Sequence, residues 1–302
     1  MDVLVTGSSG FIGRHLVQML AQRGHQVVGL DRRMVSLPLP REIRNLKGEV
    51  TRECLRKIAR RPDWIFHCAG GGSVGFAENH PEEDFRMNVG TSLEVLAYAR
   101  NLRPVPRVVF LSSAAVYGNS ACRGISEGGP LRPCSSYGFH KLLAEQAFQY
   151  YSRRWSIPVA ILRLFSVYGE GLQKQIFWDA SQKMNQGASL FSGSGKETRD
   201  FVHIDDVCRL LLLAPKVART PAIILNCGRG KAVRLQTALG ILARQWRVSK
   251  PRFSGKSRPG DPLHLVSDAR RAFRLGWKPD VELREGLRRY AAWVSQGKQR
   301  GR

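Results

Sequence analysis

Tyr137 and Lys141 are the two residues of this sequence best suited to moving a proton. They are four positions apart in the segment Tyr-Gly-Phe-His-Lys, so a helix would place both side chains on one face. A Lys141 ammonium would lower the pKa of the Tyr137 phenol, because it favours the phenolate. Ser113 stands twenty-four residues upstream at the end of an apolar run, where its hydroxyl would share the same substrate oxygen. The trio predicts proton exchange with a substrate hydroxyl.

A glycine-rich turn near the start of the chain predicts a dinucleotide site. Residues 6–13 read Thr-Gly-Ser-Ser-Gly-Phe-Ile-Gly and lie between an apolar run and a helical stretch. Gly7 permits a tight turn, Gly10 lets the backbone approach a pyrophosphate, and Gly13 lets helix and strand pack closely. The first N–H groups of the helix would then hold the phosphates. An oxidised nicotinamide held by this site would accept hydride and would further favour the Tyr137 phenolate.

The residue that ends the next apolar run bears on which dinucleotide binds. Asp31 stands eighteen residues after Gly13, where a carboxylate would accept hydrogen bonds from both adenosine ribose hydroxyls. This favours NAD. Arg32 and Arg33 follow at once, and either guanidinium would suit a 2′-phosphate, so NADP is the alternative.

The segments that carry the trio, the glycine turn and Asp31 belong to a sequence in which strand-like and helical stretches alternate. Helical periodicity at 14–23 and 89–99 falls between short apolar runs. The runs that predict strands cover residues 3–6, 26–30, 64–68, 107–113 and 159–164. Strands that alternate with helices predict an α/β fold, a doubly wound parallel sheet covered on both faces.

The composition changes after about residue 165, where Gly and Ser cluster and helical patterns dominate. We therefore expect a dinucleotide-binding domain over residues 1–165 and a smaller, mainly helical substrate lobe over 166–302. The apolar run at 223–226 predicts a strand that rejoins the sheet, within a returning segment near 199–228.

Six motifs, in order along nearly the whole chain, carry a resemblance to a known family. They are TGSSGFIG at 6–13, HCAG at 67–70, SSAAVYG at 112–118, YGFHK at 137–141, RDFVHIDD at 199–206 and GDPLHLVSDARRAFRLGWKP at 260–279. With them the chain resembles the extended short-chain dehydrogenases/reductases. It is most similar to the NAD-dependent nucleotide-sugar epimerase/dehydratase family, and within it to UDP-glucose 4-epimerase-like members. The resemblance implies a Rossmann-type fold.

The resemblance also implies roles for individual residues. Ser113, Tyr137 and Lys141 match the catalytic trio of the family. The cofactor-binding positions are Gly7, Gly10, Phe11, Ile12, Gly13, Asp31, Arg32, Glu49, Val50, Cys68, Ala69, Gly70, Asn88, Ser112, Tyr137, Lys141 and Phe165. The substrate-binding positions are Ser73, Ser113, Tyr137, Ser166, Phe191, Arg199, Arg258 and Asp261. Glu49 departs from the Asp that the family usually has there. Arginine suits Arg199 and Arg258, because a guanidinium can bind a diphosphate with two hydrogen bonds.

The family carries out 4-epimerisation, 4,6-dehydration and ketone reduction. Dehydratases have carboxylates directly after the strand-end Ser or Thr, whereas this chain has Ala114 and Ala115, which cannot transfer protons. The segment resembles that of the 4-epimerases, in which a transient 4-keto sugar turns over before hydride returns. Ser166 departs from the Asn typical of epimerases, which leaves open an NAD(P)H-dependent reductase of a nucleotide-linked 4-keto-6-deoxy sugar.

The formal net charge of +24 suits several kinds of anionic partner. It fits a solvated Arg-rich surface, an acidic small molecule, or a nucleic acid or membrane surface. An RNA-binding protein of the same fold is a distant alternative, because the trio is intact and no aromatic RNA-binding motif is present. We expect a UDP-, GDP- or dTDP-linked sugar as partner, no membrane or nucleic acid, and a homodimer through helices near 92–102 and 140–154.

Other features predict a reduced, cytoplasmic protein without a metal. The six cysteines include no CxxC pair, and no apolar run is long enough to span a bilayer. The first residues lack the pattern of a secretory signal. The seven histidines form no HExxH motif or other ligand-like pair.

Overall fold

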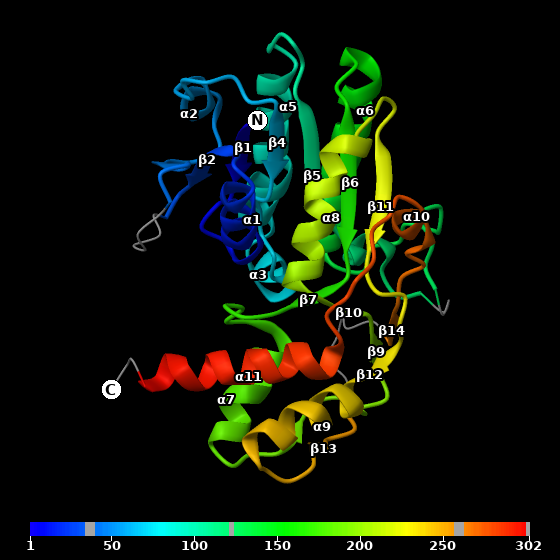
Figure 1. The fold of residues 1–302 in the computed structure, drawn as a ribbon. Helices are drawn as coiled ribbons and strands as arrows, with labels where there is room; N and C mark the ends of the chain where they lie inside the picture. Colours follow the sequence, from blue (N-terminus) through cyan, green and yellow to red (C-terminus); the bar gives the residue numbers. More distant parts are fainter. Residues whose placement is uncertain (34–39, 121–123, 257–262, 300–302) are drawn as a thin grey trace. The chain divides into compact units, whose positions relative to one another are not determined.

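The computed structural model describes residues 1–33, 40–120, 124–256 and 263–299. Its largest sheet has seven strands in the order β11-β6-β5-β4-β1-β2-β3 (Figure 1). The strands are β1 (Asp2–Thr6), β2 (Gln26–Asp31), β3 (Ile43–Lys47), β4 (Trp64–His67), β5 (Arg107–Ser113), β6 (Val159–Leu164) and β11 (Ile223–Cys227). The pairs β1–β2, β1–β4, β2–β3, β4–β5 and β5–β6 are parallel. The predicted α/β fold with a parallel sheet is confirmed.

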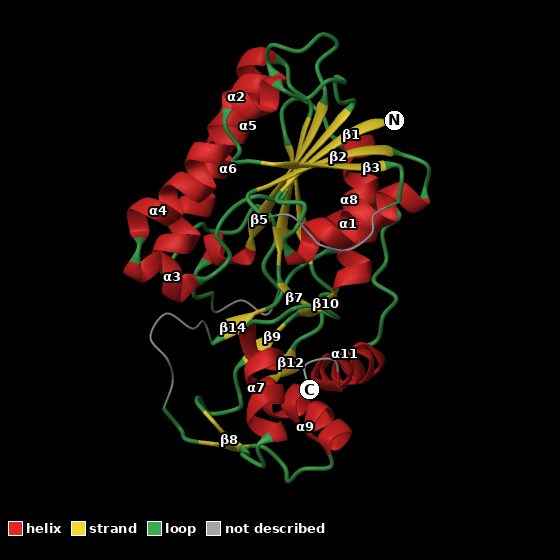
Figure 2. Ribbon diagram, turned by 90° about the vertical axis from the view of Figure 1, so that its left-hand side faces the viewer, coloured by secondary structure: helices red, strands yellow, loops and turns green. Residues whose placement is uncertain are grey.

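Helices cover both faces of this sheet. Figure 2 shows α1 and α8 on one face and α2, α5 and α6 on the other. Those on the first face are α1 (Phe11–Gln22) and α8 (Ile204–Val217). Those on the second side are α2 (Arg52–Arg56), α3 (Val74–Asn79), α4 (Pro81–Phe85), the π-helical turn η1 (Arg86–Gly90), α5 (Thr91–Ala99) and α6 (Ser136–Trp155). Among the described residues, no helix combines the length and the apolar content needed to cross a bilayer.

Because helices cover both faces of the sheet, most of its strands could be predicted from the sequence. A strand buried on both faces is a continuous apolar run, and residues such as Leu4, Ile65, Phe110 and Ile161 are 0–1% exposed within one core cluster. β3 was not predicted. It forms the outer edge of the sheet, and its sequence Ile-Arg-Asn-Leu-Lys holds only two apolar residues. Charged side chains are common on edge strands, and here they interrupt the apolar run that would have predicted a strand.

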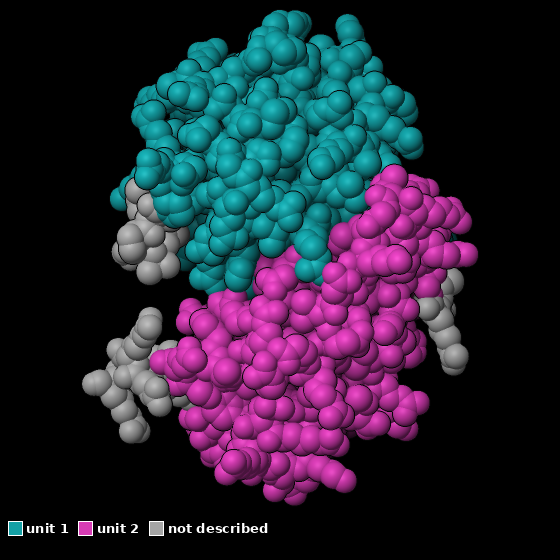
Figure 3. Space-filling model, viewed as in Figure 1, with its two compact units in different colours: residues 1–118, 130–164, 208–225 teal, residues 119–129, 165–207, 226–302 magenta. Residues whose placement is uncertain are grey.

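The chain folds into two compact units (Figure 3). Unit 1 comprises residues 1–118, 130–164 and 208–225. Unit 2 comprises residues 119–129, 165–207 and 226–302. The sequence placed the boundary between residues 165 and 166, and it did not predict that residues 119–129 belong to the second unit. The functions assigned to the two parts remain predictions.

Unit 2 contains helices and three small sheets. Its helices are α7 (Gln175–Asn185), α9 (Leu235–Trp246), α10 (Arg270–Arg274) and α11 (Leu283–Gln299). Its strands are β7 (Ser166–Tyr168), β8 (Leu190–Phe191), β9 (Thr198–Arg199), β10 (Phe201–His203), β12 (Val233–Arg234), β13 (Arg252–Phe253) and β14 (His264–Leu265). These strands have two or three residues each, too short to show a hydrophobic period.

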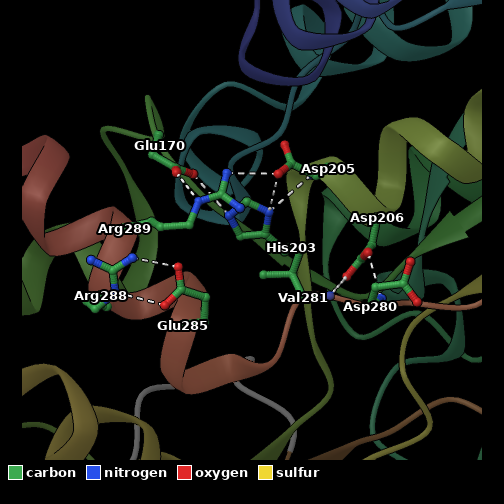
Figure 4. A network of polar contacts seen from close by, with 9 residues as sticks. All are labelled: Glu170, His203, Asp205, Asp206, Asp280, Val281, Glu285, Arg288 and Arg289. Carbon is green, nitrogen blue, oxygen red and sulfur yellow. Dashed lines mark hydrogen bonds and ion pairs between the residues drawn. The ribbon is translucent and has the colours of Figure 1, made fainter.

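A polar network in unit 2 fastens α11 to the residues around β7 and β10 (Figure 4). His203 is fully buried, and its Nε2 lies 3.0 Å from a carboxylate oxygen of Glu170. Arg289 in α11 donates to Glu170 at 2.7 Å and to Asp205 at 2.8 Å. Burial lowers the pKa of His203, but hydrogen bonds with Asp205 and Glu170 outweigh burial and raise it above the usual value. The cluster therefore favours the imidazolium.

Replacing His203 by Gln is expected to remove a pH-dependent part of the stability. Because the folded pKa is raised, the charged His203 stabilises the fold fully below about pH 6.5, the usual value for an unfolded chain, and loses this effect as the pH rises through the folded pKa. The loss in the variant should be about 1–3 kcal/mol at low pH and should shrink at high pH. Thermal unfolding over a pH series measures this difference. His264→Gln, at an exposed histidine, is the control, and a loss that does not vary with pH would contradict the prediction.

Candidate active site

The turn after β1 has the shape that a dinucleotide requires. Gly7 has a φ of +70°, and a Cβ atom there would lie 2.6 Å from the backbone nitrogen of Ala69. A Cβ atom on Gly13 would lie 2.1 Å from the carbonyl oxygen of Gly7, so only glycine allows α1 to pack this closely on the turn. The N-cap of α1, Gly10, has no side-chain hydrogen bond among the described residues, and the first turn has no acidic residue. The free N–H groups fit a pyrophosphate.

Asp31 is oriented toward this turn by two backbone N–H groups. Its Oδ2 accepts a hydrogen bond from Ser9 at 3.0 Å, and its Oδ1 accepts one from Arg33 at 3.0 Å. The guanidinium of Arg32 lies near Met87, with Nη2 at 3.7 Å from its sulfur. The carboxylate at the end of β2 is thus held beside the glycine turn, as a partner for ribose hydroxyls would be.

The predicted trio comes together at the ends of β5 and α6. Ser113 is the last residue of β5, and its side chain forms a hydrogen bond with Tyr137. Ser135 caps α6, because its Oγ accepts a hydrogen bond from the N–H of Gly138 at 3.1 Å. Lys141 is 5% exposed, and its Nζ donates to the carbonyl oxygen of Leu111 at 3.0 Å. The cap and the buried lysine fix the first turns of the helix that carries Tyr137.

The protonation equilibria of the trio differ from the prediction. Burial raises the pKa of Tyr137 to about 12, although its hydrogen bond with Ser113 acts in the opposite direction. Burial lowers the pKa of Lys141 to about 8, and nearby negative charge, that of Asp84 above all, opposes this shift. The prediction that Lys141 lowers the pKa of Tyr137 is therefore wrong for the side chains of this chain. The Lys141 ammonium points at the carbonyl of Leu111 instead, and burial of the phenol dominates.

The remaining predicted positions of unit 1 lie in η1, in β5, at the start of α3 and directly after β3 and β4. Asn88 is 1% exposed, its Nδ2 donates to the carbonyl oxygen of Asp84 at 3.1 Å, and its Oδ1 has no hydrogen-bond partner among the described residues. Ser112 donates its hydroxyl hydrogen to Glu145 at 2.5 Å, so this hydroxyl has no hydrogen left to donate to a ligand. Cys68, Ala69 and Gly70 follow β4, Glu49 and Val50 follow β3, and Ser73 caps α3.

Four predicted site residues, three for the substrate and one for the cofactor, lie in the described part of unit 2. Phe191 is 8% exposed and packs beside Phe253, with ring centroids 6.2 Å apart. Phe165 is buried, and Ser166 and Arg199 are half-buried. Arg258 and Asp261 lie outside the described residues. Nothing in the structure tests the ligands assigned to these positions, and those assignments remain predictions.

The sequence analysis missed several residues that support the site. Asp84 lies four residues before Asn88, and His140 directly precedes Lys141. Their short distance in the sequence from two predicted site residues is the one feature that could have pointed to them. Asp200 directly follows Arg199 and is fully buried. Its carboxylate accepts hydrogen bonds from the N–H groups of Arg229 at 2.7 Å, Gly230 at 2.9 Å and Ser267 at 3.1 Å, and from the Ser267 hydroxyl at 2.5 Å.

Comparison with known proteins agrees with this geometry. Residues 3–228 match the model of the NAD dependent epimerase/dehydratase family. A Methanocaldococcus jannaschii protein, provisionally named as a UDP-glucose 4-epimerase, is 31% identical over 97% of this chain and 98% of its own. The UDP-glucose 4-epimerase of Thermotoga maritima, solved with UDP-glucose, is 27% identical, with a TM-score of 0.90 over 99% of this chain and 100% of its own. MoeE5, solved with UDP-glucuronic acid and NAD, is 32% identical, with a TM-score of 0.86 over 98% of this chain and 100% of its own.

Proposed function

Because the chain belongs to the NAD dependent epimerase/dehydratase family, we propose that it is a 4-epimerase of a UDP-linked sugar. It is an NAD-dependent enzyme of nucleotide-sugar epimerisation, and its cofactor is NAD. The finer assignment rests on one observation: the Ser113 hydroxyl lies near enough to the Tyr137 phenol to lower its pKa, and the two residues that follow Ser113 are alanines. The site thus holds one proton-transferring phenol and lacks the extra acid and base that dehydration needs at this strand end. The nucleotide-linked sugars named for the relatives support the choice of UDP.

In the proposed reaction Tyr137 removes the proton from the C4 hydroxyl of the sugar and later returns it. NAD, when bound, accepts and returns the C4 hydride and adds a positive charge that favours the Tyr137 phenolate. Ser113 donates a hydrogen bond to the reacting oxygen, which orients it toward the phenol. Lys141 holds the end of β5, which carries Ser113, through its hydrogen bond to the Leu111 carbonyl. The proton and the hydride both return to a transient 4-keto sugar, so the reaction has no net consumption of cofactor.

An assay without added cofactor tests the proposal. The purified protein should contain NAD and should interconvert 4-epimers of UDP-glucose, UDP-glucuronic acid or UDP-N-acetylglucosamine. A 4-keto sugar reductase, the alternative that Ser166 raised, would instead consume one reduced cofactor for each product. Consumption of NADH or NADPH in that ratio, without epimer interconversion, would reject the epimerase.

We further propose that the enzyme works as a homodimer through α5 and α6. Large apolar side chains are exposed on these helices, with Leu93 40%, Phe139 50% and Tyr150 56% exposed. Such exposure is typical of surfaces that pair in an oligomer. Light scattering coupled to size-exclusion chromatography should give twice the chain mass of 33.8 kDa, and Phe139→Glu should shift it toward the chain mass. A wild-type protein with the mass of one chain would contradict the dimer.

A further inference from the structure

A buried carboxylate and a histidine lie beside the trio without a role in the proposed reaction. Asp84 in α4 is fully buried, and its Oδ2 lies 2.8 Å from Nδ1 of His140. His140 is 7% exposed and stands between Tyr137 and Lys141 in α6. At this helical spacing His140 and Lys141 lie three and four residues after Tyr137, so all three share one side of the helix. The pair is therefore placed to act on the trio.

The second oxygen of Asp84 faces the same space as the Lys141 ammonium. Asp84 Oδ1 is buried and has no hydrogen-bond partner among the described residues. A Cβ atom on Gly71 would lie 2.2 Å from this oxygen, and one on Gly70 would lie 3.3 Å from Nζ of Lys141. Two adjacent glycines thus border both charged groups. Two buried charges that both border the same pair of glycines interact strongly, because little solvent screens them.

The charge of Asp84 acts on both members of the Tyr–Lys pair. Burial lowers the pKa of Lys141, and Asp84 is the largest influence that raises it. Burial raises the pKa of Tyr137, and Asp84 raises it further. Asp84 thus favours the ammonium and opposes the phenolate. Among the described residues, the other titratable or charged groups on the surrounding elements are His67 and Cys68 at the end of β4, Glu145 of α6, Glu78 of α3 and its C-cap His80, Glu82 and Glu83 of α4, and Arg86 of η1.

His140 connects this buried carboxylate to the surface. Its ring lines a shallow hollow on unit 1 together with Pro81, Glu82, Phe85 and Arg86. The ring of Phe85 packs edge-on against it, with centroids 5.5 Å apart. The imidazole therefore stands between the surface hollow and the fully buried carboxylate.

We propose that Asp84 and His140 are positioning residues that set the charge experienced by Tyr137 and Lys141. The carboxylate holds Lys141 as an ammonium and opposes ionisation of the phenol, and the contact with His140 fixes the position of the carboxylate. The inference deepens the proposed function and rests on it for the role of Tyr137. It predicts that the charge of Asp84 sets the pH dependence of the reaction without touching substrate.

Asp84→Asn tests the charge, because it keeps the size of the side chain. In the NAD-loaded enzyme, titration of the Tyr137 phenol and the pH profile of kcat should both move to lower pH, by about half a unit to one unit. The tyrosinate absorbance is read as the difference between each protein and its Tyr137→Phe version. His140→Gln keeps a hydrogen-bond donor for the carboxylate, so its profile and its phenol titration should stay close to those of the wild type. Glu82→Gln, in the same hollow, is the control that leaves the profile in place.

A profile and a phenol titration that stay at the wild-type pH in Asp84→Asn would overturn the inference. So would a shift of His140→Gln as large as that of Asp84→Asn. If Asp84→Asn fails to fold, as judged by thermal unfolding, Asp84→Ser, which removes the same charge with a smaller side chain, takes its place. The phenol titration does not depend on turnover. A wild-type protein without epimerase activity would therefore reject the proposed function, while the titration would still decide whether Asp84 acts on Tyr137.

Discussion

Replacing Tyr137 by Phe is expected to lower kcat for epimerisation by about 10²- to 10⁴-fold, the usual contribution of a positioned acid–base group. The phenol oxygen is the one atom of this chain that exchanges the C4 proton in the proposed reaction. The ring is otherwise retained, so the packing of α6 and the Ser135 cap should persist. Steady-state rates at saturating UDP-sugar measure the loss, and KM should change much less than kcat.

Two measurements make this result specific. The NAD content and the unfolding temperature of Tyr137→Phe should match those of the wild type, because the glycine turn is unaffected. Tyr151→Phe, which removes a hydroxyl from the same helix, should keep the wild-type rate. Substantial turnover in Tyr137→Phe would reject the proposed proton transfer. A parallel loss in Tyr151→Phe would trace the effect to the helix and not to the site.

Replacing Arg163 by Met is expected to destabilise the protein by about 3–5 kcal/mol, because it leaves a buried carboxylate without its counter-charge. Arg163 in β6 is 1% exposed, and Glu145 in α6 is fully buried. The guanidinium donates from Nη2 at 2.7 Å and from Nε at 2.9 Å to Glu145, and from Nη1 to the Tyr117 hydroxyl at 2.9 Å. Chemical denaturation measures the loss in free energy of unfolding.

A second substitution separates the lost charge from the lost packing. The double variant Arg163→Met with Glu145→Leu removes both charges and should recover most of the stability, because an apolar pair avoids the cost of desolvation. Arg288→Met breaks the exposed pair with Glu285 and should change the free energy of unfolding far less, because solvent screens this pair. A double variant as unstable as the single one would show that the cost comes from the shape of the side chain and not from the unpaired carboxylate.

The parts of the site that follow local rules were predictable from the sequence. A glycine turn between a strand and a helix, a Tyr–Lys pair at helical spacing, and a Ser at a strand end each have a local pattern. The structure confirms the elements that carry them and brings Ser113 next to Tyr137. The family followed from the order of the motifs. Edge strand β3 had no such pattern because only two of its residues are apolar, and the strands of unit 2 had none because they are only two or three residues long.

What the sequence could not supply depends on tertiary burial. The spacing of Tyr137 and Lys141 predicts that the lysine lowers the pKa of the phenol, but packing buries the phenol and directs the ammonium to a carbonyl. The partners Asp84 and His140 are 56 positions apart, and only the fold brings them together. The same is true of Glu145 and Arg163. Nothing in the sequence shows that these two charged residues pair, but in the fold both are buried.

One feature of α6 restricts how this enzyme can change over evolutionary time. Tyr137, Lys141 and Glu145 are spaced four residues apart and form one stripe along α6. Residues proposed for the reaction and a residue needed for stability therefore lie on consecutive turns of the same helix. Substitutions within this stripe should lower turnover or stability, while Phe139 and Tyr150 on the exposed side should be restricted only by the proposed contact with a second copy of the chain. In a saturation library of α6, the positions that tolerate few substitutions should therefore fall on two sides of the helix, one serving the site and the core and the other serving the partner.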